Sequence, residues 1–157
     1  MIVLWRISNH ADLQGLGGEK AEGRWHTPSR GKRIVYLSEN PATALIETLA
    51  NFKGNPALFP DAFQLLRIEV PATVSRTAVA LSTLSALWKQ TPTETQPIGN
   101  AWLSQAASAL LRVPSAPSPE SFNYLFNPLH PDAHLVTIKT AQRITYDQRL
   151  FHTWPTT

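Results

Sequence analysis

One short segment, residues 33–49, restricts the fold of this chain more than any other. Residues 33–38 (Arg-Ile-Val-Tyr-Leu-Ser) are rich in β-branched and aromatic types and predict a strand. Asn40 and Pro41 follow at once, and this pair is typical of the N-cap and first position of a helix. The helix would carry an apolar stripe made of Ala42, Leu45, Ile46 and Leu49. A strand that leads directly into a helix predicts a fold that mixes both.

Glu47 lies on this predicted helix but away from its apolar stripe. At about 100° per residue, Glu47 falls about 150° from the centre of the stripe. Most glutamates on such a face are solvated. Alternatively, this face of the helix borders a cleft and the carboxylate serves a site. The local pattern leaves both interpretations open.

The remaining regular elements are predicted from hydrophobic spacing. A second helix is expected at 98–111, and strands are expected at 2–5, 63–71, 135–139 and 143–146. The buried positions expected in that helix are Ile98, Trp102, Ala106, Ala109 and Leu110. Because these elements do not alternate as regular βαβ units, we predict an α+β fold with a mixed, mainly antiparallel sheet.

Three stretches are predicted to be irregular. Residues 15–23 hold more than half of the glycines and predict a mobile loop. Residues 72–97 are rich in Thr, Ser and Pro, with one helical turn expected near 84–88. Residues 112–131 contain five prolines, so we expect contacts rather than a strand ladder to order them.

Composition limits the class of protein. The chain has 157 residues, which suits one domain spanning 1–157, and it is 43% hydrophobic and 16% charged, as in soluble globules. The net charge of +3 allows anionic ligands but does not demand a nucleic acid partner. There is no cysteine, no apolar run of about 20 residues and no signal-peptide core before Arg6. We therefore expect a cytoplasmic protein without disulfides or a membrane span.

Common catalytic patterns are missing from the sequence. The five histidines form no pair with metal-ligand spacing, because Pro131 interrupts the His130–His134 pair. Ser115 and Ser121 lack an evident His–Asp pair, which argues against a serine nucleophile. Basic residues are scattered, so no nucleic-acid-binding face is predicted.

Several short segments occur together in an order that resembles the RES domain, a family named for its Arg, Glu and Ser. The resemblance covers residues 2–150. The segments are Leu4-Trp5-Arg6, Gly23-Arg24-Trp25, Val35-Tyr36-Leu37-Ser38, Ala44-Leu45-Ile46-Glu47, Gly99-Asn100-Ala101-Trp102-Leu103, Leu111-Arg112-Val113-Pro114-Ser115, Asn123-Tyr124-Leu125-Phe126-Asn127-Pro128-Leu129-His130-Pro131 and Tyr146-Asp147-Gln148-Arg149-Leu150.

The resemblance implies a toxin of a bacterial toxin–antitoxin pair, held inactive by a helix-turn-helix antitoxin of the Xre type. It further implies a fold similar to ADP-ribosyltransferases, NAD as the substrate, no metal, and a homo-oligomer within the complex. Carried over by position, the expected catalytic residues are Glu47, Arg6 and Ser115, and the expected NAD-binding residues are Arg24, Tyr36, Trp25 and Asn123. Where family members usually have Asn after Gly-Arg-Trp, this chain has His26.

These residue types suit the implied chemistry. Cleavage of the nicotinamide–ribose bond passes through an oxocarbenium-like state, which the Glu47 carboxylate can stabilise. Arg6 and Arg24 offer forked, permanently charged donors to the pyrophosphate. Tyr36 can stack on the nicotinamide, and Ser115 can orient Glu47 or the ribose.

Other functions stay open from the sequence. The acceptor of the ADP-ribosyl group can be water, phosphate or a protein, because acceptor choice depends on the rim of a cleft. A toxin that only binds a partner is a second alternative. A ribonuclease-type toxin would need a His pair or a dense basic face, which the sequence lacks.

Overall fold

The computed structural model describes residues 1–53, 55–58 and 63–151. The sequence also predicts a frayed tail from His152, and this tail lies outside the described residues. The helices and strands are, in chain order, β1 (Ile2–Ser8), α1 (Leu16–Lys20), β2 (Val35–Ser38), α2 (Pro41–Asn51), β3 (Gln64–Val70), β4 (Arg76–Ala78), α3 (Pro92–Gln105), β5 (Leu110–Pro114), β6 (Phe122–Phe126) and β7 (Thr137–Arg143). Single 3-10 turns lie at Pro56–Leu58, Leu81–Thr83, Trp88–Gln90, Pro131–Leu135 and Gln148–Phe151.

The described strands form one seven-stranded sheet in the order β4-β5-β6-β2-β1-β3-β7. Within it, β4 and β5 are parallel, and every other neighbouring pair is antiparallel. The sheet is therefore mixed and mainly antiparallel, with helices packed on it rather than alternating between its strands. The predicted α+β class is confirmed.

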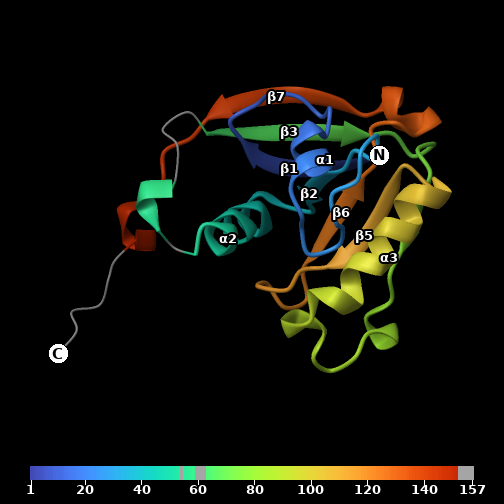
Figure 1. Cartoon of the computed structure of the whole chain (residues 1–157). Coiled ribbons are helices and arrows are strands. Elements are labelled where there is room, and N and C mark those ends of the chain that lie inside the picture. The colour runs from blue at the N-terminus through green and yellow to red at the C-terminus, as the bar shows by residue number, and fades with distance from the viewer. Residues whose placement is uncertain (54, 59–62, 152–157) are drawn as a thin grey trace.

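The sheet is nearly divided between β1 and β2. β1 pairs with β3 along its whole length, from Ile2↔Val70 to Ser8↔Gln64, but it bridges β2 only at Trp5↔Ser38. In Figure 1, β1, β3 and β7 run across the top of the molecule, whereas β2, β6 and β5 run below them in a different direction. Strand twist accumulates across a sheet, and here it separates two halves that meet beside Ser38.

Each face of the sheet packs against a hydrophobic core of its own. In β6, Leu125 points into one core and the next residue, Phe126, into the other, as strand alternation requires. The core on the Phe126 face includes Leu4, Val35, Leu37, Leu66, Ile68, Val70 and Leu110. The core on the Leu125 face contains Trp25, Ile34, Trp88, Trp102, Leu103, Leu111 and Val113.

Helix α2 begins where the sequence predicts. Asn40 is extended at the N-cap, and its side-chain oxygen accepts a hydrogen bond from Thr43 N at 2.8 Å. Pro41 follows in the first turn, where its missing N–H costs nothing. The start of the helix is thus set by local chemistry, which is why the sequence predicted it.

The face that α2 buries is not the predicted apolar stripe. The buried residues are Thr43, Ala44 and Thr48, whereas Ile46 of the stripe is 40% exposed. Thr48 Oγ1 donates to Ala44 O at 2.8 Å, so this hydroxyl is buried with a partner. The core-facing stripe was therefore wrong, and Glu47 lies on the side of the helix that faces the sheet.

The proline-rich stretch 112–131 holds most of two central strands, β5 and β6, which corrects the expectation of an unladdered segment. Pro114 is the last residue of β5, and Pro128 lies beyond the end of β6. The prolines therefore fall at strand ends and in the connection, where their missing N–H groups break few ladder bonds.

Helix α3 spans Pro92–Gln105 rather than the predicted 98–111. It begins six residues earlier because Pro92 stands in the first turn, and it continues through Pro97. It ends at Ala106, whose left-handed backbone (φ 47°) stops the helix. Ala109 and Leu110 are buried as predicted, but through β5 and its approach rather than through a helix.

The glycine-rich stretch 15–23 contains the short helix α1, which the expectation of a plain loop missed. Gly15 precedes it with a left-handed backbone (φ 71°). Glu19 then ties α1 to the following segment, because its carboxylate accepts from Gly31 N at 3.1 Å and contacts Arg33 at 3.4 Å. Tertiary contacts thus order a segment whose local propensity is low.

Two strands at the sheet edges also differ from prediction. The short β4 lies within 72–97, which was expected to be irregular, and it pairs with β5 in parallel. β7 is one strand rather than two, because Gln64 to Glu69 of β3 provide a continuous partner for it with a register shift between Arg67 and Ile68.

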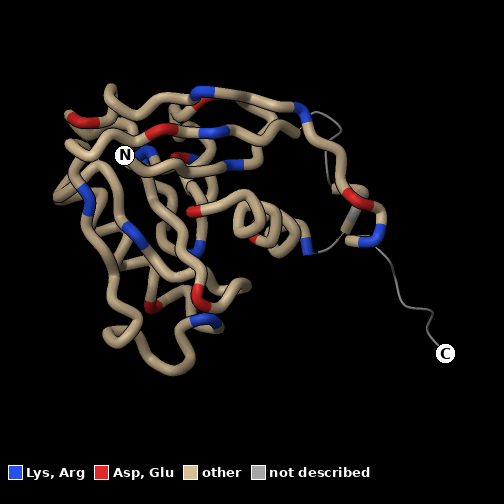
Figure 2. The backbone as a smooth tube through the Cα atoms, turned by 180° about the vertical axis from the view of Figure 1, so that it is seen from behind, with Lys and Arg blue, Asp and Glu red and all other residues tan. Residues whose placement is uncertain are grey.

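Charged residues are spread over the described fold. Figure 2 shows Lys and Arg on both halves of the molecule, interspersed with Asp and Glu. None of the helices within the described ranges has the length and apolar character needed to cross a membrane.

Candidate active site

Glu47 accepts two hydrogen bonds on one carboxylate oxygen. Ser115 Oγ donates to Glu47 Oε1 at 2.7 Å, and Asn123 Nδ2 donates to the same atom at 2.6 Å. Ser115 directly follows β5 and Asn123 lies in the adjacent β6, whereas Glu47 comes from α2. Hydrogen bonds to an ionised carboxylate are stronger than neutral ones. The structure therefore brings three of the predicted site residues into direct contact.

Further hydrogen bonds hold the two donors in place. Ser38 Oγ donates to Asn123 Oδ1 at 2.8 Å, which turns the amide NH2 group toward Glu47. Ser115 Oγ accepts from Ser118 N at 3.2 Å, so its own proton is left for Glu47. Ser115 is 3% exposed. Its hydroxyl both donates a hydrogen bond and accepts one, which suits a donor that orients Glu47 and not a nucleophile.

The second carboxylate oxygen of Glu47 is open. Among the residues that the structure describes, none donates a hydrogen bond to Oε2, and the Glu47 side chain is only half-buried. A carboxylate fixed through one oxygen and free at the other can accept a hydrogen bond from a ligand in a defined direction. This asymmetry separates Glu47 from a solvated surface glutamate.

Ser38 is the member of this group that sequence reasoning did not assign to the site. It lies two residues after Tyr36 in β2, and side chains two apart in a strand share a face. That spacing was a usable signal. The spacing would have placed Ser38 on the same face as Tyr36, which was already assigned to the site. The hydrogen bond of Ser38 with Asn123 joins residues 85 apart in sequence and could be found only from the tertiary structure.

Arg24 is presented by a tight turn from Gly23 to His26. Gly23 N donates to His26 O at 3.1 Å, and the two residues form an isolated bridge. The turn lies close to Tyr36, since a Cβ added to Gly23 would stand 2.4 Å from the Tyr36 hydroxyl oxygen. A glycine is therefore required at this position for the turn to approach β2.

Helix α3 supports the same turn from the other side. Thr95 Oγ1 donates to Arg24 O, and Thr95 is fully buried. Gly99 lies against the Trp25 carbonyl so closely that a Cβ at Gly99 would be 1.7 Å from the oxygen. The main chain of the turn is thus held rigidly while its side chains diverge.

The side chains of Arg24 and Trp25 have different surroundings. Arg24 Nη1 donates to Lys89 O at 2.7 Å, and its Cζ lies 5.9 Å from the ring centre of Trp88. Trp25 is 2% exposed, and its ring centre is 6.1 Å from that of Trp88 in the core. Trp25 therefore supports the turn from inside the core, and its expected contact with NAD stays a prediction.

Tyr36 lies within electrostatic reach of both Glu47 and Arg24. Burial raises the pKa of the Tyr36 hydroxyl above its ordinary value, and the nearby Glu47 carboxylate adds to this effect. The hydrogen bond from Trp25 N and the charge of Arg24 act in the opposite direction. The hydroxyl is therefore neutral at physiological pH.

Arg6 forms no hydrogen bond or ion pair with the Glu47 group. It follows Trp5 in β1, and strand alternation places its side chain on the same face as Leu4. Its guanidinium makes no hydrogen bond or ion pair with residues in the described ranges. Burial lowers the pKa of Arg6, and the charge of Asp12 raises it. A partly buried cation without a fixed partner suits an anionic ligand, but the structure does not join Arg6 to Glu47.

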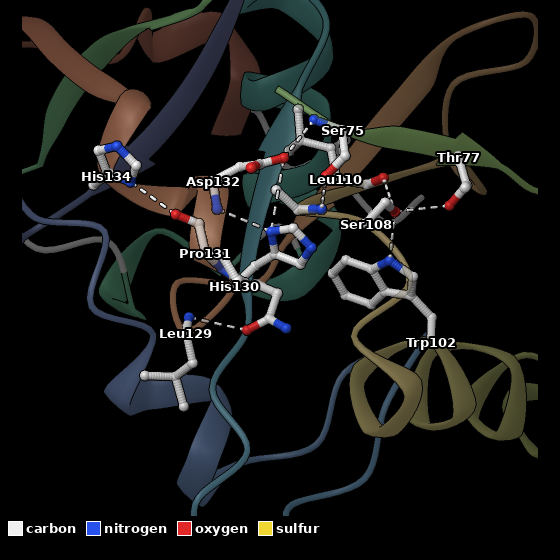
Figure 3. Close-up of polar contacts among 12 residues, drawn as sticks. Ser75, Thr77, Trp102, Ser108, Leu110, Leu129, His130, Pro131, Asp132 and His134 are labelled. Atoms are coloured by element: carbon white, nitrogen blue, oxygen red, sulfur yellow. Dashed lines mark hydrogen bonds and ion pairs between the residues drawn. The ribbon is translucent and has the colours of Figure 1, made fainter. Parts of the chain in front are cut away.

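A second buried polar cluster lies at the opposite end of β5 (Figure 3). Trp102 Nε1 donates to Ser108 Oγ at 3.0 Å, and Ser108 Oγ donates to Leu110 O at 2.7 Å. Thr77 Oγ1 lies 2.9 Å from Ser108 Oγ and completes its hydrogen bonds as a donor. The Ser108 hydroxyl thus uses its one proton and both lone pairs inside the protein.

A pocket of about 320 Å³ lies near this second cluster and not at Glu47. His130 Nδ1 accepts from Asp132 N at 3.1 Å, and Asp132 Oδ2 accepts from Ser75 N at 2.9 Å (Figure 3). Within the described ranges, no three His, Cys, Asp or Glu side chains are grouped to hold a metal ion. The pocket is lined by Leu13, Phe126, Pro128, His130, Pro131, Ala133, His134 and Val136.

The architecture and the site together define a class. A single α+β domain carries a nearly divided, mainly antiparallel sheet, a helical carboxylate beside the division and an arginine on a clamped turn. The model of the RES domain family matches residues 3–147, and the chain belongs to that family.

Similar proteins agree with this assignment. "Toxin Res" of Pseudomonas putida is 43% identical over 150 residues, covering 96% of this chain and all of that protein. The "Prs ADP-ribosylating toxin" of a Sphingobium species is 34% identical over 156 residues, covering 93% and 94%. The crystal structure of the M. tuberculosis MbcT–MbcA toxin–antitoxin complex matches with a TM-score of 0.73 at 15% identity, covering 92% of this chain and 84% of the matched one, which supports the fold.

Proposed function

We propose that this chain is the toxin of a bacterial toxin–antitoxin pair and that it breaks the nicotinamide–ribose bond of NAD. One observation carries the proposal: Glu47 is fixed through Oε1 by two donors while Oε2 is open. Family membership and the names of the relatives, "Toxin Res" and "Prs ADP-ribosylating toxin", support it.

The chemistry assigned to Glu47 is stabilisation of positive charge. When the bond between C1′ of the ribose and the nicotinamide nitrogen breaks, its electron pair leaves with the nicotinamide, which departs neutral. The ribose then carries an oxocarbenium-like charge. Glu47 Oε2 accepts a hydrogen bond from a ribose hydroxyl and stabilises this charge electrostatically. The acceptor adds to C1′ and loses its proton, which completes the exchange.

Ser115 and Asn123 keep Glu47 oriented for this role. Both are buried, and both donate to Oε1, so they restrict rotation of the carboxylate. A group that is already oriented needs little reorganisation when charge develops on the substrate. We therefore assign Ser115 to positioning within the catalytic group rather than to covalent attack.

The arginines and Tyr36 are assigned to binding. Arg24 keeps N–H groups beyond the one bonded to Lys89 O, and these can bind a phosphate oxygen. Arg6, which lacks a fixed partner among the described residues, is assigned to the pyrophosphate at a distance from Glu47. The Tyr36 ring, close to both Glu47 and Arg24, is assigned to packing against the nicotinamide.

The acceptor of the ADP-ribosyl group distinguishes the remaining alternatives. The relative named as an ADP-ribosylating toxin favours testing a protein acceptor beside water and phosphate. Purified chain is incubated with labelled NAD alone, with phosphate, and with cell extract, and the products are separated. Release of nicotinamide together with free ADP-ribose indicates hydrolysis. Release together with a phosphorylated ADP-ribose indicates phosphorolysis, and release together with labelled protein indicates transfer to a protein. Unchanged NAD in all three arms would sink the enzymatic proposal and leave a toxin that acts by binding.

We further assign a helix-turn-helix antitoxin of the Xre type as the partner, in a complex that contains more than one copy of the toxin. The solved structural neighbour is itself a toxin–antitoxin complex. With a net charge of +3 and arginines at the site, an acidic segment of the antitoxin suits direct occlusion of the cleft. Binding should then weaken as salt is raised, and the mass of the complex in solution reports the copy number. An interface remote from Arg6 and Arg24 would contradict occlusion.

A further inference from the structure

His26 occupies a buried position between the tyrosine of the site and the helix α1. It is 3% exposed, so its ring is shielded from solvent. Its Nδ1 lies 2.7 Å from the Tyr36 hydroxyl oxygen. Its Nε2 lies 2.8 Å from Gly18 O and 2.9 Å from Ala21 O. One imidazole therefore joins the β2 strand to the end of α1 through both of its nitrogens.

The partners of His26 determine where its proton lies. Gly18 O and Ala21 O are carbonyl oxygens and can only accept, so Nε2 must carry the hydrogen. In the neutral ring, Nδ1 then holds a lone pair and accepts from the Tyr36 hydroxyl. For the neutral ring, these partners are compatible only with the Nε2–H tautomer.

This arrangement also fixes the direction of the Tyr36 hydroxyl. Its oxygen accepts a hydrogen bond from Trp25 N at 3.1 Å, and its proton goes to His26 Nδ1. The space around the oxygen is closed as well, because a Cβ on Gly23 would stand 2.4 Å from it. The hydroxyl is therefore turned toward the protein, and Tyr36 offers a ligand its ring rather than its O–H.

The contacts to α1 give His26 a second effect. Gly18 lies within α1 and Ala21 is its C-cap residue, and this five-residue helix buries no side chain of its own. A ring N–H donated to two carbonyls at that end satisfies acceptors that the short helix leaves free. His26 thus fixes the position of α1 relative to the turn that carries Arg24.

We propose that His26 is a positioning residue of the NAD site: as the Nε2–H tautomer it holds the Tyr36 ring in place through the hydroxyl and ties it to α1. The catalytic part of this inference rests on the proposed function. Asparagine, the usual family residue at this position, has one donor and one acceptor group on a shorter side chain.

The tautomer is tested directly by nitrogen NMR of the wild-type protein. With ¹⁵N-labelled histidine, long-range proton–nitrogen spectra distinguish protonated Nε2 from unprotonated Nδ1. His26→Gln removes one signal set and assigns it. We expect protonated Nε2, unprotonated Nδ1 and a slowly exchanging ring proton. An Nδ1–H tautomer, or a freely exchanging ring, overturns the inference whether or not the protein consumes NAD.

The positioning role is tested by a double-mutant cycle with NAD. We expect His26→Ala to raise KM roughly tenfold with a smaller change in kcat, since it removes one hydrogen bond that orders the binding ring. Tyr36→Phe, which keeps the ring, should raise KM less than Tyr36→Ala does. In the Tyr36→Phe background the effect of His26→Ala on KM should shrink, because both changes remove the same bond.

Two outcomes of the cycle separate the inference from its premise. Fully additive effects of His26→Ala and Tyr36→Phe on KM mean that His26 acts only on folding, and the inference fails. Wild-type protein that folds and leaves NAD unchanged contradicts the proposed function, and the NMR result then decides the tautomer alone. If His26→Ala does not fold, His26→Asn supplies the same cycle, with a rise in KM above the wild-type value expected.

Discussion

Two serines at opposite ends of β5 are both buried, yet their hydroxyls have different kinds of hydrogen-bond partner. Ser108, before the strand, is 1% exposed, and Ser115, after it, is 3% exposed. The Ser108 hydroxyl bonds to Trp102, Thr77 and Leu110, all of which are satisfied within the protein. The Ser115 hydroxyl bonds to a carboxylate that keeps one open oxygen.

The difference teaches how to separate a structural polar cluster from a functional one. Burial alone does not do so, because unsatisfied polar groups are costly and both clusters are well bonded. The distinguishing feature is a strong acceptor, Glu47 Oε2, that is held at a fixed direction without a partner among the described residues. A cluster whose donors and acceptors are all satisfied stabilises the fold, whereas a cluster that keeps an acceptor without a partner can bind a ligand.

The largest expected effect comes from Glu47→Gln. Gln keeps an acceptor for Ser115 and Asn123 but removes the negative charge that faces the ligand. We expect NAD turnover to fall by about a hundredfold or more while NAD still binds, because the lost interaction acts mainly in the transition state. Steady-state kinetics and calorimetric binding measure the two quantities.

The control for Glu47→Gln is its stability. Thermal unfolding should show a change of about 1 kcal/mol or less, since both hydrogen bonds to the side chain remain available. In a growing bacterium, wild type should stop growth and the Gln variant should not. Wild-type turnover by a folded, NAD-binding Gln variant would remove Glu47 from the mechanism.

Arg24→Ala should have the next largest effect, on affinity rather than on folding. Removing a charged donor to phosphate costs about 1.5–3 kcal/mol, which is roughly tenfold to over a hundredfold in Kd. The turn itself is held through main-chain contacts to Thr95 and Gly99, so it should persist. Arg24→Lys is the matched control, since it keeps the charge but loses the fork. Loss of folding in the Ala variant would mark Arg24 as structural.

The paired variants Ser115→Ala and Ser108→Ala sharpen the comparison most directly. Ser108→Ala leaves Trp102 Nε1 without its buried partner, so we expect about 1–3 kcal/mol lower stability and unchanged turnover per folded molecule. Ser115→Ala removes one of two donors to Glu47 and should lower turnover roughly tenfold. Chemical denaturation and kinetics on both proteins provide the test. If the two variants gave the same pattern, the distinction drawn between the clusters would be wrong.

The smallest expected effect is the pH dependence of stability that arises from Asp132 and its hydrogen bond with Ser75. Hydrogen bonding from the side chain and the backbone of Ser75 lowers the pKa of Asp132. A folded pKa below the unfolded one means that the stabilisation is fully present above about pH 4, the ordinary Asp value, and is lost as pH falls through the folded pKa. Unfolding followed against pH should show this loss in wild type and not in Asp132→Asn. An unchanged acid limb in Asp132→Asn would exclude this contribution.

Local signals in the sequence were sufficient for part of the fold. Asn40 and Pro41 fixed the start of α2, because capping chemistry acts over a few residues. Apolar runs located β1 and β3, and the mixture of elements predicted the α+β class. Family resemblance then supplied Glu47, Ser115 and Asn123, whose contact the structure shows.

The missed elements share a physical cause. β5 and β6 lie largely in a stretch whose five prolines hide its strand propensity. The ladder forms because Pro114 is paired only at the last position of β5, opposite Phe122, and the other four prolines lie outside the two strands. The buried face of α2 was misjudged because threonines that bond within the helix can replace apolar residues at a packed surface. In both cases the tertiary partner outweighed the local pattern.

What the sequence by itself determined is therefore the set of residue types and the local starts and ends of several elements. What only the tertiary structure decided is their arrangement in the site. Ser115 and Asn123 reach Glu47 across 68 and 76 residues of chain, Trp25 turns into the core, and Arg6 makes no hydrogen bond or ion pair with a described residue. Hydrogen bonds between such distant residues depend on sheet order and helix rotation, and no local pattern encodes either, because each is set by the packing of the whole domain.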